Sequence, residues 1–254
     1  MKNWHGLLEN LHSKMFTMPI AKNNILLLIR SYNEATRIVW VIEGIFDAGF
    51  ENILVVDDGS TDGTAELLER QFGGKIFSIR HVINRGAWAA LETGFAFVRK
   101  EAIHQGWEYI VTFDADGQHD ISDIPKFLHY FEQHPMTDVV YGSRFIVKTN
   151  SNVPFFRRIL LWWGKIFTSM ISGVKLTDAH NGYRMFRTRV VMKVFLSMDG
   201  MEYASELIDQ IQQQWFQIRE VPVNIHYDEY SMAKWQRYGW ALRIAMRMIF
   251  KKFF

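Results

Sequence analysis

Short apolar runs alternate with amphipathic segments along the first half of the chain. Residues 25–29 carry apolar side chains only, which is typical of a strand that is covered on both faces. Apolar side chains in residues 38–46 and 87–104 instead recur at the three- and four-residue spacing of a helix. The predicted strands are 25–29, 53–56, 77–82, 109–113 and 139–141. This alternation predicts an α/β fold with a mainly parallel sheet flanked by helices.

Polar clusters follow the first four predicted strands. They are Ser31-Tyr32-Asn33-Glu34, Asp57-Asp58-Gly59-Ser60, Asn84-Arg85-Gly86 and Asp114-Ala115-Asp116. Any one of them could be a turn or a helix cap, since these residue types favour both. The carboxyl ends of parallel strands, however, meet at one edge of a sheet, where ligands bind. Together the clusters predict a binding site at that edge.

Asp114 and Asp116 are alternate residues at the end of a buried strand, and Gln118 follows them. Their side-chain oxygens are hard ligands that suit Mg²⁺ or Mn²⁺. Such an ion neutralises a diphosphate and stabilises it as a leaving group. The alternative is that one carboxylate caps the next helix while the other is solvated. The neighbouring polar clusters favour the metal site.

The second half of the chain has a different pattern. After Arg144 it is helix-rich, aromatic and basic, most clearly in residues 155–170, and residues 236–254 form an amphipathic basic helix. These stripes suit anionic lipid headgroups, although they could also pack on the core or form a dimer interface. We expect an amphipathic extension at 1–23, a catalytic domain at 24–235 with a helical C-terminal portion, and the basic helix at 236–254.

Composition excludes several classes of protein. A hydrophobic share of 48% in 254 residues is enough for one large core. The absence of cysteine excludes disulfides and thiolate metal sites, and a net charge of +2 gives little support for nucleic acid as a partner. Residues 1–23 lack the apolar segment of a signal peptide, and the apolar stretch 159–174 is interrupted by Lys165. We therefore expect a cytoplasmic protein at the inner face of the cytoplasmic membrane.

The combination of motifs resembles family 2 glycosyltransferases of GT-A fold. The resemblance rests on Tyr32-Asn33-Glu34, residues 56–62, Asn84-Arg85-Gly86 and residues 114–118, and extends through Gly142-Ser143-Arg144, residues 181–186, 220–223 and 230–234. It covers roughly residues 24–234 and is similar to the branch of dolichyl-phosphate mannose synthases and bacterial polyprenyl-phosphate glycosyltransferases. The resemblance implies a Rossmann-like sheet and inverting transfer of a hexose from a nucleotide-diphosphate sugar, with UDP or GDP as the nucleotide.

The resemblance also implies roles for particular residues. The donor would contact Tyr32, Asn33, Glu34, Asp58, Asn84, Gly86, Asp114 and Lys234. Mg²⁺ or Mn²⁺ would be bound by Asp114, Asp116 and Gln118. The reaction centre would include Asp116, Arg144 and Asp178, and the acceptor side Arg157, Arg158, Tyr183 and Arg184.

Two acceptor chemistries remain open. A polyprenyl phosphate is already an anion and needs orientation, whereas a saccharide hydroxyl in cell-surface polysaccharide synthesis needs a general base. Asp178, Glu202 and Glu206 are the carboxylates available for that role. The basic aromatic stretch favours the lipid phosphate, although Trp162-Trp163 stands where relatives often carry a small hydroxyl residue.

Two further classes of protein compete with a glycosyltransferase. A non-catalytic nucleotide-sugar binding protein is the first, and the intact pair Asp114 and Asp116 argues against it. A nucleotidyltransferase is the second. The chain contains neither a G-x-x-x-x-G-K-[ST] loop nor a G-x-G-x-x-G after its first strand, which argues against that class.

Overall fold

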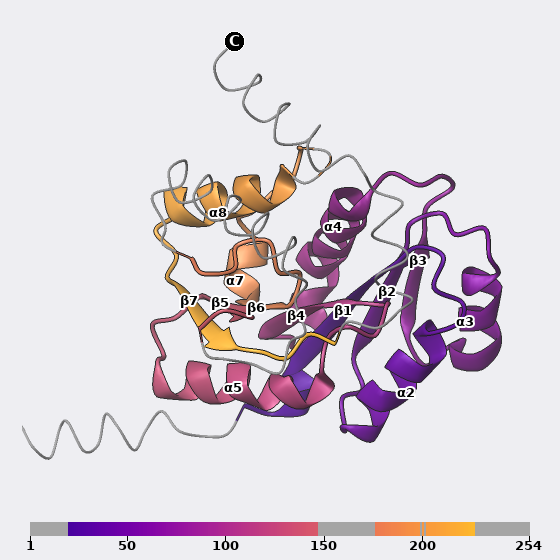
Figure 1. Ribbon diagram of the computed structural model, residues 1–254, viewed down its shortest axis with the longest axis horizontal. Helices are drawn as coiled ribbons and strands as arrows, with labels where there is room; N and C mark the ends of the chain where they lie inside the picture. Colours follow the sequence, from indigo (N-terminus) through magenta and orange to yellow (C-terminus); the bar gives the residue numbers. More distant parts are fainter. Residues whose placement is uncertain (1–19, 147–175, 199, 201, 227–254) are drawn as a thin grey trace, which may run out of the picture.

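The computed structural model describes residues 20–146, 176–198, 200 and 202–226. Within them, seven strands form one sheet in the order β3-β2-β1-β4-β6-β5-β7 (Figure 1). The strands are β1 (Ile25–Ser31), β2 (Ile53–Asp57), β3 (Phe77–Arg80), β4 (Tyr109–Asp114), β5 (Val139–Ser143), β6 (Arg184–Arg187) and β7 (Ile218–Pro222).

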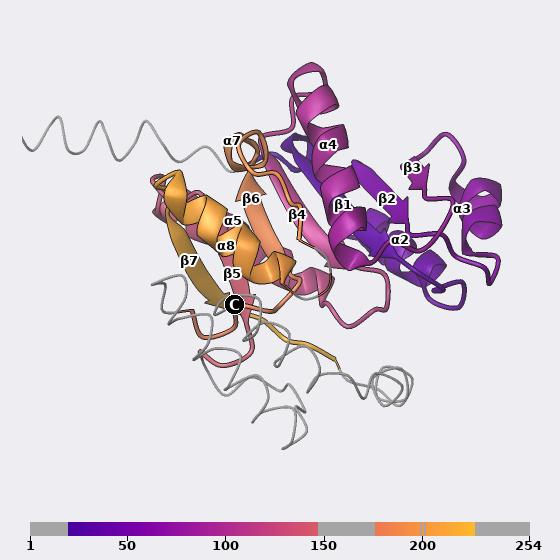
Figure 2. The ribbon, with the colours of Figure 1, turned by 90° about the horizontal axis from the view of Figure 1, so that it is seen from above.

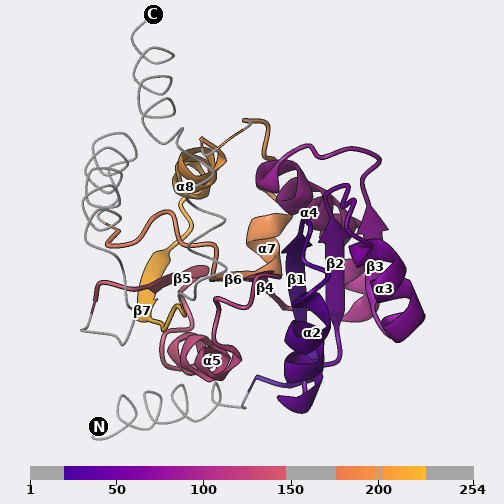
Figure 3. The ribbon, with the colours of Figure 1, turned by 45° about the vertical axis from the view of Figure 1, so that its right-hand side comes forward.

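Helices cover both faces of this sheet. They are α2 (Ile38–Asp47), α3 (Thr64–Phe72), α4 (Ala87–Gln105), α5 (Ile124–Gln133), α7 (Thr188–Val191) and α8 (Tyr203–Gln213), with the 3-10 turns η1 (Lys22–Asn24) and η2 (Ile121–Asp123). Helices α4, α7 and α8 lie on one face of the sheet, and α2, α3 and α5 lie on the other (Figure 3). Their apolar side chains pack against the sheet on each side. Because successive side chains of a strand point to opposite faces, the strands contribute alternately to the two cores.

The strand directions decide where the loops lie. β1 pairs in parallel with both β2 and β4, and β2 pairs in parallel with β3. β6 runs antiparallel to β4 and β5, and β7 is parallel to β5 (Figure 2). The carboxyl ends of β1, β2, β3 and β4 therefore meet at one edge of the sheet, as the sequence pattern predicts.

The five predicted strands and both predicted helices are present, and the α/β fold class is confirmed. The second half of the chain contributes two strands, β6 and β7, that the sequence pattern did not predict. The basic helix expected at 236–254 and most of the extension at 1–23 lie outside the described residues, so the domain boundaries stay predictions. Among the helices in the described ranges, none combines the length and the hydropathy needed to cross a membrane.

Helix α4 approaches the sheet closely at Gly94. An added Cβ at this position would lie 2.6 Å from Leu28 Cδ2 and 3.0 Å from Leu28 Cγ. Leu28 is fully buried, so it has no solvent-filled space into which it could move. Glycine at position 94 therefore brings the helix that follows β3 close to β1.

We predict that Gly94→Ala destabilises the protein by about 1 kcal/mol, because overpacking outweighs the better helix propensity of alanine. In a Leu28→Ala background the same change should stabilise by about 1 kcal/mol, since the methyl group then has room. Urea unfolding of the four proteins of this double-mutant cycle measures both values. A destabilisation that is equal in both backgrounds would contradict the proposed contact.

Candidate functional site

The loops that follow β1 and β2 are joined by hydrogen bonds. The Asn33 N–H donates to Ser60 Oγ at 2.8 Å, and the Thr61 N–H donates to Asn33 Oδ1 at 2.9 Å. Asn33 has a φ of 55°, a left-handed conformation that asparagine tolerates better than most residues. Asp57 accepts the Ser60 N–H at 3.2 Å, which holds the second loop against the end of β2. Two of the predicted donor-binding clusters thus form one surface.

Glu34 is buried beneath this surface and is 3% exposed. Its N–H donates to Thr64 Oγ1 at 3.1 Å, and its carbonyl oxygen accepts the N–H groups of Arg37 and Ile38. Glu34 therefore connects the start of α2 to the start of α3. Its neighbour Tyr32 is only partly buried. The predicted contacts of both residues with a donor stay predictions.

Asp58 organises the loop that follows β3. Its carboxylate accepts the Arg85 N–H at 2.9 Å and the Gly86 N–H at 2.7 Å. His81 Nδ1 lies 2.7 Å from Asp58 Oδ1, and His81 Nε2 lies 2.9 Å from Thr93 Oγ1. One buried carboxylate thus holds residues 81–86 across the end of β2. The donor contact of Asp58 stays a prediction.

The loop after β3 packs against the loop after β2 so closely that position 59 must be glycine. Gly59 has a φ of +73°, and an added Cβ there would lie 2.6 Å from the carbonyl carbon of Ile83 and 2.8 Å from the Asn84 nitrogen. The two backbones are therefore in direct contact. Asn84 itself is exposed and Gly86 is partly buried. This packing brings the third polar cluster beside the first two.

Asp114, the first carboxylate of the Asp-x-Asp pair, forms an ion pair with Arg30 of β1. Its N–H donates to His119 Nδ1 at 3.2 Å, which leaves the proton of a neutral imidazole on Nε2. Burial lowers the pKa of His119 to about 4, against the attraction of Asp114. Burial also opposes ionisation of Asp114, but Arg30 and His119 outweigh it and lower the pKa of Asp114.

Asp116 and Gln118 lie at the partly exposed side of the same loop. The Gln118 N–H donates to Asp116 Oδ1 at 3.1 Å, and Arg37 Nη1 donates to the Asp116 carbonyl oxygen at 2.9 Å. The His226 N–H donates to the Gln118 carbonyl oxygen at 2.9 Å, so a distant segment also holds the loop. Gly117, with a φ of 74°, allows the tight turn between the two side chains.

These side chains fit a hard divalent cation. Asp114, Asp116 and Gln118 offer only oxygen ligands from the protein side chains. No group of three or more His, Cys, Asp or Glu side chains that could hold a metal ion occurs within the described ranges. Three side chains are fewer ligands than the octahedral shell of Mg²⁺ needs, so such an ion would also keep water or phosphate ligands at this partial site.

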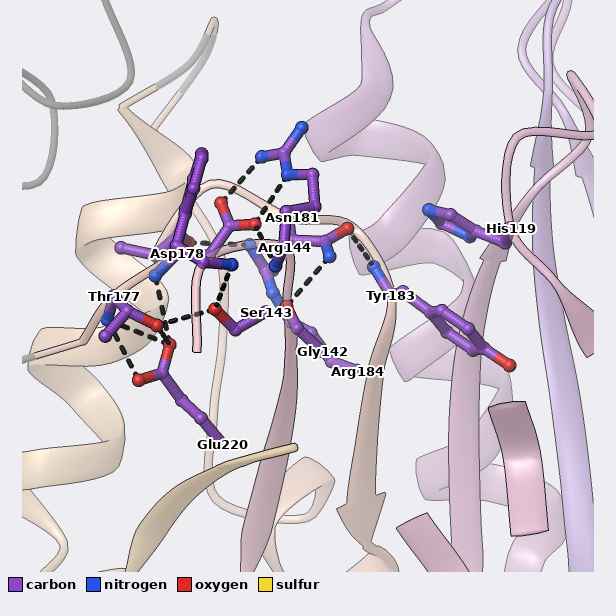
Figure 4. Close-up of polar contacts among 12 residues, drawn as sticks. His119, Gly142, Ser143, Arg144, Thr177, Asp178, Asn181, Tyr183, Arg184 and Glu220 are labelled. Atoms are coloured by element: carbon purple, nitrogen blue, oxygen red, sulfur yellow. Dashed lines mark hydrogen bonds and ion pairs between the residues drawn. The ribbon is translucent and has the colours of Figure 1, made fainter. Parts of the chain in front are cut away.

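Arg144 and Asp178 form a bidentate ion pair at the other end of this sheet edge (Figure 4). Arg144 Nε donates to Asp178 Oδ2 at 2.6 Å and Nη2 donates to Oδ1 at 2.6 Å, while the Arg144 backbone N–H donates to Oδ2 at 3.2 Å. The two residues are 8% and 3% exposed, respectively. The fold therefore brings together two residues predicted for the reaction centre, and they form an ion pair with each other.

Glu220 of β7 holds the turn that carries Asp178 (Figure 4). Its carboxylate accepts the N–H groups of Thr177 at 2.9 Å and of Asp178 at 3.0 Å, and also the Thr177 hydroxyl at 2.9 Å. Thr177 Oγ1 in turn lies 2.5 Å from Ser143 Oγ, at the end of β5. Strands β5 and β7 together thus position the ion pair.

Tyr183 and Arg184, predicted for the acceptor side, point into the interior. Tyr183 stacks on His119 with ring centroids 4.7 Å apart, and its hydroxyl donates to the Asp120 carbonyl oxygen at 2.9 Å. Arg184 is 1% exposed, with its guanidinium 4.8 Å from the centroid of the Tyr141 ring. Both residues shape the site from inside, and their contact with an acceptor stays a prediction.

Three predicted residues, Arg157, Arg158 and Lys234, lie outside the described residues. Four residues that sequence reasoning missed contact the predicted site residues: Arg30, His81, His119 and Glu220. Arg30 gave a signal, because it is a charged residue at the end of an otherwise apolar strand. Glu220 begins the stretch 220–223 that the family resemblance includes, although no role was predicted for it. His81 and His119 had no local signal.

Comparison with known proteins assigns the family. Residues 27–195 match the family described as glycosyl transferase family 2. The chain belongs to this family. The matched residues include most of the loops that lie at the carboxyl edge of this sheet.

Individual relatives of this family 2 glycosyltransferase cover nearly the whole chain. An uncharacterised protein of Methanocaldococcus jannaschii is 32% identical, over 92% of this chain and 95% of the relative. The UDP-N-acetylglucosamine–dolichyl-phosphate N-acetylglucosaminyltransferase of Methanococcus voltae is 30% identical, over 92% of this chain and 98% of the relative. The polyprenol monophosphomannose synthase of Mycolicibacterium smegmatis is 28% identical, over 82% and 80% of the two chains.

Solved structures show the same fold at low sequence identity. The glucosyl-3-phosphoglycerate synthase of Mycobacterium tuberculosis, crystallised with Mn²⁺, UDP and phosphoglyceric acid, aligns with a TM-score of 0.57 at 14% identity. The alignment covers 83% of this chain and 73% of that one. The GT-A fold is therefore confirmed.

We predict that Asp58→Asn destabilises the protein by about 2 kcal/mol and weakens nucleoside diphosphate binding at least about tenfold, because an amide nitrogen would face a backbone N–H. Urea unfolding and calorimetry with UDP and GDP measure these two effects. Asp47→Asn, an exposed change at the end of α2, is the matched control and should change neither quantity. Unchanged binding by a folded Asp58→Asn variant would contradict the role of Asp58.

Proposed function

We propose that this glycosyltransferase transfers a sugar, with inversion, from a nucleotide-diphosphate sugar to a polyprenyl phosphate, in the presence of Mg²⁺ or Mn²⁺. The observation that carries the proposal is the bidentate pair of Arg144 and Asp178. Both oxygens of Asp178 accept charge-assisted hydrogen bonds from Arg144, so this carboxylate is already engaged within the protein. The reaction centre therefore suits an acceptor that arrives already ionised.

Glu206, another of the three candidate bases, is occupied as well. Glu206 accepts the Ser197 N–H at 3.0 Å, the Ser197 hydroxyl at 2.7 Å and the Met198 N–H at 2.9 Å. A sugar hydroxyl would need a base within hydrogen-bond reach, whereas a phosphate monoester needs none. The occupied carboxylates support the phosphate acceptor over the hydroxyl acceptor.

The relatives support the same acceptor class. The M. voltae and M. smegmatis proteins carry names that specify dolichyl-phosphate and polyprenol phosphate chemistry. A polyprenyl phosphate is held in a membrane, so we propose peripheral contact of this protein with the cytoplasmic face of the membrane. Arg157 and Arg158 are the residues that we assign to the acceptor phosphate, since guanidinium pairs well with phosphate.

The donor side follows from the joined loops. The nucleoside would lie against Tyr32, Asn33, Glu34, Asp58, Asn84 and Gly86, and Lys234 would contact the diphosphate. Asp114, Asp116 and Gln118 would hold Mg²⁺ or Mn²⁺, which supplies neutralisation of the leaving diphosphate. Arg144, held in place by Asp178, would orient the phosphate or sugar. The acceptor oxygen then forms a bond to the anomeric carbon as the bond to the donor phosphate breaks.

We expect the full chain to glycosylate a short polyprenyl phosphate but not the polyprenol with the same tail. The two acceptors differ only in the phosphate, so the comparison isolates the ionised nucleophile from lipid binding. A set of radiolabelled UDP and GDP sugars is offered as donors, and thin-layer chromatography measures the product formed from each of the two acceptors. Transfer to polyprenol, or to a saccharide hydroxyl alone, would refute the phosphate acceptor.

Removal of the metal should stop transfer, and re-addition of Mn²⁺ or Mg²⁺ should restore it. Asp116→Asn should lower the rate at least about a hundredfold because a charged oxygen ligand is lost. The far-ultraviolet circular dichroism spectrum should stay unchanged, since Asp116 is partly exposed. Asp47→Asn is again the control. Normal turnover by Asp116→Asn, or in excess chelator, would argue against the metal site.

A further inference from the structure

Arg30 is a buried cation directly beside the proposed metal loop. Its side chain is 9% exposed, whereas that of its partner Asp114 is 31% exposed. Arg30 Nη1 donates to the Tyr203 hydroxyl at 2.9 Å, and Nη2 forms the ion pair with Asp114. The guanidinium therefore connects the end of β1 to the end of β4 and to the first residue of α8.

The ion pair is enclosed by backbone. An added Cβ at Gly182 would lie 2.7 Å from Arg30 Nη2 and 2.8 Å from Asp114 Oδ2. Thr112 Oγ1 donates to the Gly182 carbonyl oxygen at 2.6 Å, which holds this backbone against the pair. Arg30 and Asp114 consequently have little freedom to separate or to reorient.

A positive charge in this place needs an explanation. A cation beside a cation site weakens metal binding, because like charges repel. The protein holds Asp58 in the next loop with two backbone N–H groups, so a carboxylate at this edge does not need an arginine to be held. Arg30 neutralises one of the two carboxylates of the proposed metal loop. Its charge therefore changes the electrostatic potential at the loop as well as holding Asp114 in place.

We propose that Arg30 is a positioning residue that orients Asp114 and reduces the affinity of the loop for a bare divalent cation, so that the ion is held mainly as its complex with the donor diphosphate. This proposal rests on the proposed function. The diphosphate restores the negative charge that Arg30 cancels, and it supplies the ligands that the partial site lacks. Tyr203 fixes the guanidinium and so makes the start of α8 part of the support for the metal loop.

The test is Mn²⁺ binding to the full chain without nucleotide, followed by electron paramagnetic resonance. Arg30→Met removes the charge but keeps a similar length, and it should bind bare Mn²⁺ about tenfold more tightly than the unaltered protein. At saturating Mn²⁺ its kcat should nevertheless fall about tenfold, because Asp114 is no longer oriented. Tighter metal binding together with a lower kcat is a combination that a merely structural role would not produce.

Two further variants separate charge from packing. Arg30→Lys retains the charge and should bind Mn²⁺ like the unaltered protein. Tyr203→Phe loses only the hydroxyl, and should keep the Mn²⁺ affinity while it lowers kcat by a few-fold, roughly the effect of one lost hydrogen bond. If Arg30→Met fails to fold, Arg30→Gln is the second neutral variant, since its amide can still donate to Tyr203.

Equal or weaker Mn²⁺ binding by the folded neutral variant would overturn the proposal. Failure of the proposed function looks different. In that case the unaltered protein binds no Mn²⁺ even with UDP or GDP present, or transfers sugar without metal. The binding measurement needs no turnover, so the two failures are distinguishable.

Discussion

Parallel pairing of β1 with both β2 and β4 is the constraint on which the site depends. Residues Ile25 to Ile29 of β1 are fully buried, which gives this strand apolar neighbours on both faces and fixes it in the middle of the sheet. Its register places Arg30 opposite Val56 on one side and Asp114 on the other. The three strands therefore end at the same level of the sheet, so the polar residues that follow them lie close together. A shift of one residue would turn every side chain of β1 to the opposite face.

The carboxylates at this edge are held by different means, and the difference matters chemically. Asp58 accepts backbone N–H groups, which fold a loop, while Asp114 and Asp178 each face an arginine, which sets the local charge. Groups that are oriented before substrates bind need little rearrangement during the reaction. One edge of a sheet thus combines the loop proposed to bind the nucleoside, the partly neutralised loop proposed to bind the metal, and an arginine whose direction is set by its carboxylate partner.

The two halves of the sheet meet at this edge as well. β6 lies between β4 and β5, and the turn before it brings Gly182 against the pair of Arg30 and Asp114. The same segment carries Asn181, whose side chain donates to the Gly142 carbonyl oxygen at 2.8 Å, next to Arg144 (Figure 4). Strands β1 to β4 and strands β5 to β7 are therefore joined at this edge by short contacts.

Local pattern was sufficient for the first five strands, for helices α2 and α4, and for the placement of Asp58, Asp114 and Asp116 at one edge. Strand and helix periodicities, and the polar residues that end a strand, are properties of neighbouring residues in the chain. The four-residue strand β6 carries too little pattern to be recognised, and it exists because β4 and β5 offer it hydrogen bonds on both sides. Only the tertiary structure decided that Arg30 pairs with Asp114 and that Arg144 pairs with Asp178. Those partners lie 84 and 34 residues away along the chain, and a charge is matched by distance in space rather than by distance in sequence.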